Sequence, residues 1–143
     1  MDISHLQVRR QAHLREIETL QTEIRALNRE MENVIEAEVR TRRMEEKFVA
    51  YIAEERSLKS KMEREDKVRS AIMFANRLNP LISERAYNTA MSRINGIMTR
   101  LRRRKTQIES AIARNRRRIQ TLQDMIGSLD RQIVRQETRS TGR

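Results

Sequence analysis

The sequence contains no cysteine and very few of the residues that build turns or aromatic cores. Its 143 residues include three glycines and one proline, and aromatic residues make up 3%. A chain so poor in glycine and proline lacks the turn residues that several strands or many short helices need. The absence of cysteine excludes disulfides, thiolate metal sites and thiol nucleophiles. The sequence therefore predicts few, long elements and disfavours a compact enzyme.

The sequence also lacks the common signatures of nucleotide, metal and membrane sites. It has no GxxxxGK[ST] or GxGxxG motif, and His5 and His13 belong to no HExxH or Cys/His arrangement. The longest apolar run, 71–75, is too short to span a bilayer, and the first residues have no apolar core like that of a signal peptide. We therefore expect no catalytic residue, cofactor, metal or membrane insertion. The expected place is the cytoplasm or, for a viral protein, the host cytoplasm, nucleus or virion.

Charge is abundant and unevenly distributed along the chain. Charged residues make up 36% of the sequence, hydrophobic residues 37%, and the net charge is +11. Residues 1–80 hold 16 Lys and Arg against 15 Asp and Glu, whereas residues 81–143 hold 15 against 5. The second half therefore carries +10 of the net charge, which suggests an acidic or polyanionic partner for that half.

The second half has the most regular hydrophobic pattern in the sequence. Fourteen positions follow one another at alternating spacings of four and three, and twelve of them are apolar. A pattern that repeats every 3.5 residues over this length is typical of a left-handed coiled coil. These positions are Tyr87, Met91, Ile94, Met98, Leu101, Lys105, Ile108, Ile112, Asn115, Ile119, Leu122, Ile126, Leu129 and Ile133.

The first half has a similar pattern in two blocks. The first block is Ile17, Leu20, Ile24, Leu27, Met31 and Val34, and the second is Met44, Phe48, Tyr51, Leu58, Met62 and Ile72. The phase slips by one residue between the blocks, which predicts local unwinding near residues 35–43. Glu16, Glu23 and Glu30 each occupy the position just before a seam residue, where coiled coils carry charges that select the partner helix.

The only proline marks a turn between the two halves. Pro80 disfavours helix at Asn79 and is itself accepted in the first turn of a helix, and Asn79 or Ser83 is a candidate cap for that helix. We predict an all-α fold, a long antiparallel two-helix coiled-coil hairpin forming one structural unit. Its first helix spans 1–78, its turn 79–83 and its basic second helix 84–136, followed by a disordered tail at 137–143.

A fold-back at residues 79–80 also predicts a register. Residues whose numbers sum to about 160 would face each other, which places Phe48 against the stretch 108–112 and Glu45 near Arg114. The longer first helix would then overhang at its N-terminal turns. An extended helix kinked at Pro80, or association of hairpins into a larger helical bundle, remains an alternative.

Two basic clusters on the second helix are the candidate binding residues. They lie fourteen residues apart, so they recur on one face of the helix. Such a face either contacts phosphates or acidic protein surfaces, or is simply solvated. Lys105 and Asn115 also interrupt the apolar seam, where a polar residue selects register or oligomeric state. The cluster residues are Arg102, Arg103, Arg104, Lys105, Arg114, Arg116, Arg117 and Arg118.

The layout of the chain resembles the central-stalk proteins of type III secretion and flagellar export, which are similar to the coiled-coil stalk of rotary ATPases. The resemblance rests on the heptads, on the segment LQVRR at 6–10 and on the segment NRLNP at 76–80. It implies a helical hairpin in the cytoplasm that contacts a hexameric ATPase and an export gate in protein transport.

Two functions therefore remain open from the sequence. The first is a non-enzymatic coiled-coil assembly or adaptor protein, most concretely a type III export stalk. The second is a basic helical structural protein that binds nucleic acid or another polyanion, such as a viral or phage scaffold or nucleoprotein. Protein partners with acidic surfaces are expected in the first case, and a homo-oligomer is compatible with both.

Overall fold

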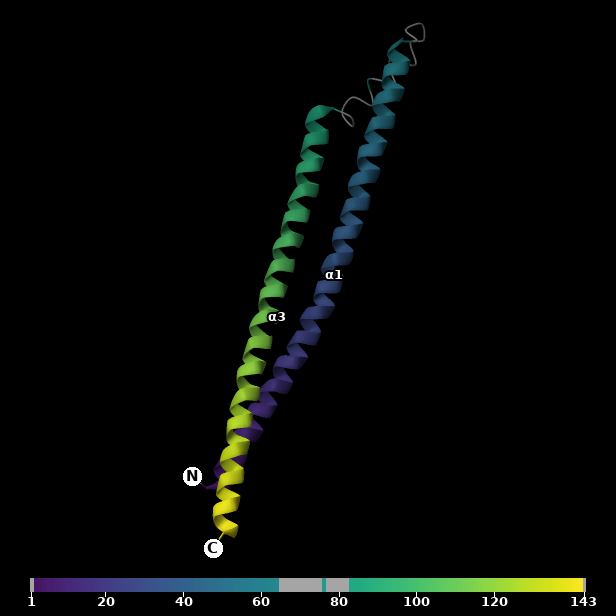
Figure 1. Cartoon of the computed structure of the whole chain (residues 1–143). Helices are drawn as coiled ribbons and strands as arrows, with labels where there is room; N and C mark the ends of the chain where they lie inside the picture. Colours follow the sequence, from purple (N-terminus) through teal and green to yellow (C-terminus); the bar gives the residue numbers. More distant parts are fainter. Residues whose placement is uncertain (1, 65–75, 77–82, 143) are drawn as a thin grey trace. The chain divides into compact units, whose positions relative to one another are not determined.

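The computed structural model describes residues 2–64, 76 and 83–142 (Figure 1). Its two long helices are α1, Ile3–Arg64, and α3, Glu84–Thr141, and the described residues contain no strand. The two helices pack against each other in opposite directions, since early residues of α1 contact late residues of α3. The predicted all-α, antiparallel two-helix hairpin is confirmed. Asn79 and Pro80 lie outside the described residues.

Both helices begin at a capping side chain. The Ser4 backbone N–H donates to the Asp2 carboxylate at 3.5 Å, and the Ala86 N–H donates to the Ser83 hydroxyl at 3.2 Å. Such bonds satisfy backbone donors that have no partner within the first helical turn. Of the two predicted caps, Ser83 therefore caps α3. At the other end α3 continues through residues 137–141, which were predicted to be a disordered tail.

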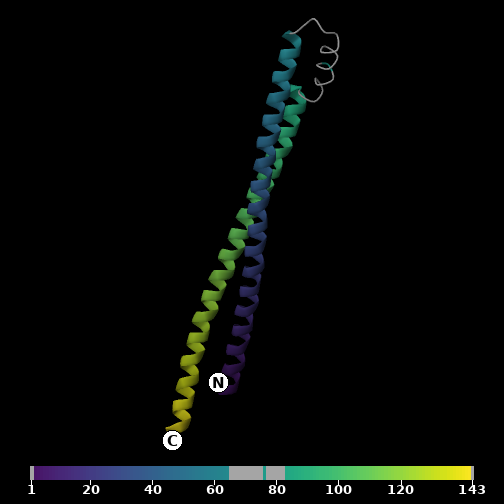
Figure 2. The ribbon, with the colours of Figure 1, turned by 90° about the vertical axis from the view of Figure 1, so that its right-hand side faces the viewer.

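The chain divides into two compact units, where one structural unit was expected. Unit 1 combines Met1–Glu32 with Lys105–Arg143, and unit 2 is Asn33–Arg104. Each unit contains a stretch of α1 and a stretch of α3. In unit 1 the N-terminal end of α1 and the C-terminal end of α3 lie side by side (Figures 1 and 2).

The core of unit 1 is a cluster of aliphatic side chains. Ile17 of α1 packs with Leu122 and Ile126 of α3, and Leu122 is fully buried. The predicted overhang of α1 is wrong: Leu6 is only 1% exposed, and Arg10 donates to the Asp130 carboxylate at 2.6 Å. The first turns of α1 are therefore paired with the last turns of α3. Further side chains packed on this cluster are Leu14, Leu20, Ile119 and Met125.

The core described in unit 2 is built around aromatic rings. Ile52, 2% exposed, packs with Phe48 and Tyr87, whose rings stack with their centroids 5.8 Å apart. The Arg56 guanidinium lies 5.1 Å from the centre of the Tyr87 ring. The predicted register is wrong, because Phe48 faces Tyr87 and not the stretch 108–112. Within unit 1 the register differs as well, since Arg118 contacts Glu16.

The seam predicted for α3 is confirmed. None of its fourteen positions from Tyr87 to Ile133 is exposed, and Ile108, Leu122 and Leu129 are among the most deeply buried side chains. Regular 4,3 spacing keeps these residues on one face of the helix, so α3 turns the same stripe toward α1 along its length.

The seam of α1 differs from the prediction in residues 35–62. The helix is unbroken there, and the sheltered positions keep strict 4,3 spacing from Leu6 to Met62, so the predicted phase slip is wrong. Polar residues occupy the seam instead: Glu38 and Thr41 are each 8% exposed. The Thr41 hydroxyl donates to the Ala37 carbonyl at 2.7 Å.

Of the second predicted block, Phe48 and Met62 lie in the seam, Ile72 lies outside the described residues, and three other residues lie outside the seam. Met44, Tyr51 and Leu58 are 46%, 48% and 39% exposed. Each lies directly before a seam position, as Glu16, Glu23 and Glu30 do in unit 1. In unit 2, part of the apolar pattern of α1 therefore follows a different face from the one that packs on α3.

Candidate docking surfaces

The first basic cluster, 102–105, presents three exposed arginines and one sheltered lysine. Arg102, Arg103 and Arg104 are exposed, whereas Lys105 is half-buried in the seam. Arg102 and Arg104 already take part in interactions within the chain. Arg103 points away from the seam, because it lies midway between seam positions on the helix. Of this cluster, Arg103 is therefore the residue most available to a partner.

The second cluster, 114–118, is partly used inside unit 1. Arg118 donates two hydrogen bonds to the Glu16 carboxylate, at 2.9 and 3.2 Å. This bidentate contact lowers the pKa of Glu16 and raises the pKa of Arg118, mainly through the hydrogen bonds and secondly through the attraction of the opposite charges. Arg114, Arg116 and Arg117 are exposed, and none of them pairs with a carboxylate of the described residues.

The two polar seam residues of α3 have different surroundings. The Asn115 amide donates to the Glu23 carboxylate at 3.1 Å, which satisfies a polar group at a half-buried position. Lys105 is half-buried at the start of the α3 stretch of unit 1. Their role in selecting register stays a prediction. The Glu23 contact and the Glu16 contact show that the acidic row of α1 is used for pairing the helices of unit 1.

Further exposed arginines belong to the outward surface of α3 and were missed from the sequence. Within unit 2, Arg93 and Arg100 lie seven residues apart on the side of the helix opposite the seam, as does Arg103. In unit 1, Arg131 and Arg135 are exposed on the outward surface. These arginines were not predicted from the sequence, because each stands alone and only runs of consecutive basic residues were considered. The heptad position of each arginine would have identified it as a residue on the outward side of α3.

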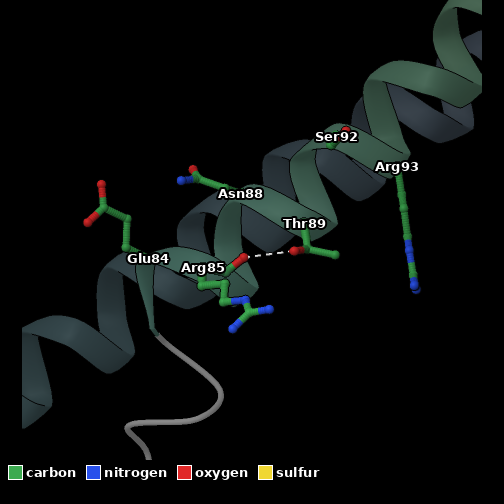
Figure 3. A pocket seen from close by; sticks show the side chains of 6 residues that line it. All are labelled: Glu84, Arg85, Asn88, Thr89, Ser92 and Arg93. Atoms are coloured by element: carbon green, nitrogen blue, oxygen red, sulfur yellow. Dashed lines mark hydrogen bonds between the residues drawn. The ribbon is translucent and has the colours of Figure 1, made fainter.

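The surface hollows described on α3 do not form an enclosed site. The hollow near the start of α3 is lined by residues of that helix only (Figure 3). Glu84 and Arg93 point in different directions, and the bond drawn runs from the Thr89 hydroxyl to the Arg85 carbonyl at 2.9 Å. These side chains do not converge on a common point, as ligand sites require. The lining residues are Glu84, Arg85, Asn88, Thr89, Ser92 and Arg93.

Searches for metal and membrane features gave no candidate in the described part of the chain. Among residues 2–64, 76 and 83–142, no three His, Asp or Glu side chains are grouped so that they could hold a metal ion. Neither described helix contains a stretch that is apolar and long enough to cross a bilayer. The surfaces that remain are therefore the exposed arginines of α3 and the exposed apolar residues of α1.

Comparison with known proteins identifies no relative. No protein-family model matches the chain, and neither the curated proteins nor the solved structures contain a significant match.

Proposed function

We propose that this protein is a non-enzymatic coiled-coil assembly protein that docks on acidic surfaces of partner proteins through the outward arginines of α3. One observation carries the proposal: α3 uses its apolar residues to pack on α1 and leaves Arg103, Arg114 and Arg117 exposed, without a bonded carboxylate among the described residues. Within unit 1, packing on α1 stiffens α3 and holds Arg114 and Arg117 at fixed positions. Docking on this stretch of α3 therefore costs little backbone entropy.

The most concrete version of this proposal is a cytoplasmic type III export stalk. In that role the hairpin would contact a hexameric ATPase and the export gate, and its basic surface would meet acidic residues of the ATPase. The helical hairpin and the exposed charges are compatible with this role. Opposite charges on the two surfaces would speed the encounter and fix the orientation of the complex.

The test removes the charges without touching the seam. The variant combines Arg103→Gln, Arg114→Gln, Arg116→Gln and Arg117→Gln, and the control combines Arg9→Gln, Arg15→Gln, Arg29→Gln and Arg43→Gln, all exposed positions of α1. Both lose four positive charges. The wild type should bind the type III export ATPase of the same organism and change its ATP hydrolysis. The α3 variant should lose binding at unchanged helicity, and the α1 control should keep it.

The same arginines support a second candidate, binding to nucleic acid or another polyanion. Arg114, Arg116 and Arg117 are exposed on neighbouring positions of one helix, as phosphate-neutralising cations are in nucleic-acid-binding proteins. In this case the protein would be a scaffold or nucleoprotein of low sequence specificity. Binding to duplex DNA and duplex RNA across a salt series separates the two functions. A steep loss of affinity with increasing salt supports binding to a polyanion, and the absence of binding at low salt excludes this function.

A further inference from the structure

The stretch of α1 in unit 2 carries a row of exposed apolar side chains. Met44, Tyr51 and Leu58 recur at intervals of seven residues and are 46%, 48% and 39% exposed. Residues seven apart lie almost directly above one another on a helix, so the three form a line along α1. They leave the α1–α3 seam but lie next to it, one position before Glu45, Ile52 and Lys59 in the sequence.

The exposed apolar row is not explained by a surplus of apolar residues in the α1–α3 core. The seam of the same stretch buries Glu38 and Thr41, and one carboxylate oxygen of Glu38 has no hydrogen-bond partner among the described residues. A helix that needed only to pack on α3 would place apolar residues at these seam positions and polar residues in the row, as α1 does from Glu16 to Met31 in unit 1. The apolar row is therefore arranged for contact with a second surface.

We propose that this second surface is the same row of a second copy of the chain, packed antiparallel on α1. The charges beside the row indicate both the partner and the antiparallel direction of packing. Lys47 and Glu54 are exposed, lie on the edge of the row away from α3, and have no ion-pair partner among the described residues.

Antiparallel pairing about Tyr51 makes the row self-complementary. It sets Met44 against Leu58 of the second copy and Lys47 against Glu54 of the second copy, and two-fold symmetry repeats both contacts. Parallel two-fold pairing would instead place the edge with Lys47 and Glu54 on opposite sides of the contact in the two copies, where these charges could not pair. The antiparallel arrangement also brings Arg40 toward Lys61 of the second copy, but Glu36 holds Arg40 at 2.5 Å within its own chain and offsets its charge.

The proposed contact goes beyond the assembly function and uses none of its arginines. A surface made by one helix of each hairpin gives a four-helix arrangement, which is a common way for coiled-coil hairpins to associate. Loss of the dimer would leave the proposed arginine surface unchanged, so the two proposals fail separately.

Sedimentation equilibrium of the full chain over a concentration series tests the proposal. The wild type should form a reversible dimer, and Tyr51→Glu should weaken dimerisation at least about tenfold, because it puts two negative charges at the centre of the contact. The matched control is Val39→Glu, which changes a residue 42% exposed on another side of the same helix and should leave the dimer intact. Circular dichroism checks that both variants remain helical.

A charge exchange tests the direction of pairing. Lys47→Glu and Glu54→Lys should each weaken the dimer, because each creates two like-charge contacts, and the double variant should restore it. A wild type that stays monomeric at every concentration overturns the proposal. Equal effects of Tyr51→Glu and Val39→Glu, or a double variant as weak as the single ones, would do so as well.

Discussion

The two units of the hairpin use the same helical spacing with different residues in the seam and in the row beside it. From Glu16 to Met31 in unit 1 the seam of α1 is apolar, with Ile17 in the core, and the neighbouring row is acidic, with Glu16 bound to Arg118. In unit 2 the seam buries Glu38, and the neighbouring row is apolar, with Met44 exposed. Both stretches keep the 4,3 spacing of sheltered positions, so the geometry is the same, while in unit 2 the seam mixes polar residues with Phe48 and Ile52 and the flank becomes apolar.

This contrast assigns different tasks to the two units. Burial of aliphatic side chains contributes about 25 cal/mol per Å² of apolar surface, whereas burial of an unpaired polar group costs free energy. Unit 1 therefore holds the helices together through its seam and uses charge on the flank to pair them. The seam of unit 2 also buries polar residues, and its exposed apolar row is available to a partner.

The largest effect is expected from the seam of unit 1. Leu122→Ala removes a fully buried side chain at the centre of the aliphatic cluster. Lost burial and the cavity left behind should lower the free energy of unfolding by about 3 kcal/mol. Urea unfolding followed by circular dichroism measures it. Val134→Ala on the same helix is the control, since Val134 is 58% exposed and its change should be small. Equal losses in the two variants would contradict the assignment of the core.

The opposite sign is expected in the seam of unit 2. Glu38→Leu replaces a buried carboxylate by an apolar side chain, and one oxygen of that carboxylate has no partner in the part of the chain that the structure describes. The free energy of unfolding should rise by about 1 to 2 kcal/mol, because a desolvated polar group is removed and apolar burial is gained. Glu46→Leu, at an exposed position of the same helix, should not stabilise the protein. A destabilised Glu38→Leu variant would show that Glu38 has a favourable role in the seam.

A smaller effect is expected at the start of α3 in unit 2. Ser83→Ala removes the acceptor of the Ala86 N–H and should cost about 1 kcal/mol, the usual value of a helix cap. Because the loss is local, amide exchange of the first turn of α3 should accelerate while amides of unit 1 change little. Ser92→Ala, at an exposed position within the helix, serves as control. Unchanged exchange at Ala86 would argue against the cap.

The smallest effect concerns the acidic row of unit 1. Arg118 lowers the pKa of Glu16 below its ordinary value of 4.5, so the pair stabilises the folded chain above that pH and loses its contribution as the pH falls through the lowered pKa. Glu16→Gln should remove this part of the pH dependence of stability. Because the pair is exposed, added salt should reduce the difference in stability between the wild type and the variant. Thermal unfolding between pH 3 and 7 measures it. Identical pH profiles would mean that the pair contributes nothing.

The sequence predicted α3 well because apolar periodicity and burial coincide there. Every seam residue from Tyr87 to Ile133 is sheltered, including the polar Lys105 and Asn115. Beyond Val34 of α1 the same rule found Phe48 and Met62, but it also chose Met44, Tyr51 and Leu58, which lie on a neighbouring face, because it follows apolar residues. No local pattern marks Glu38 as buried; only continuation of the 4,3 spacing from the first block would have found it.

The register could not be predicted from the position of the proline. The pairing depends on which core side chains meet, such as Ile17 with Leu122 and Ile52 with Tyr87, and several alignments of two heptad patterns bury similar apolar surface. The exposed arginines were easier to locate, since charge and heptad position place Arg103 and Arg117 on the outward side. The ion pair of Arg118 could be predicted only from a register that places Glu16 opposite it.

Hydrogen exchange of the native protein tests the contrast between the two units most directly. Amides of α1 around Ile17 and Ile24, beside the aliphatic seam of unit 1, should exchange at least about tenfold more slowly than amides of α1 around Glu38 and Thr41, since tenfold in exchange corresponds to about 1.4 kcal/mol of opening free energy. Equal protection in the two stretches, or slower exchange around Glu38, would contradict the account.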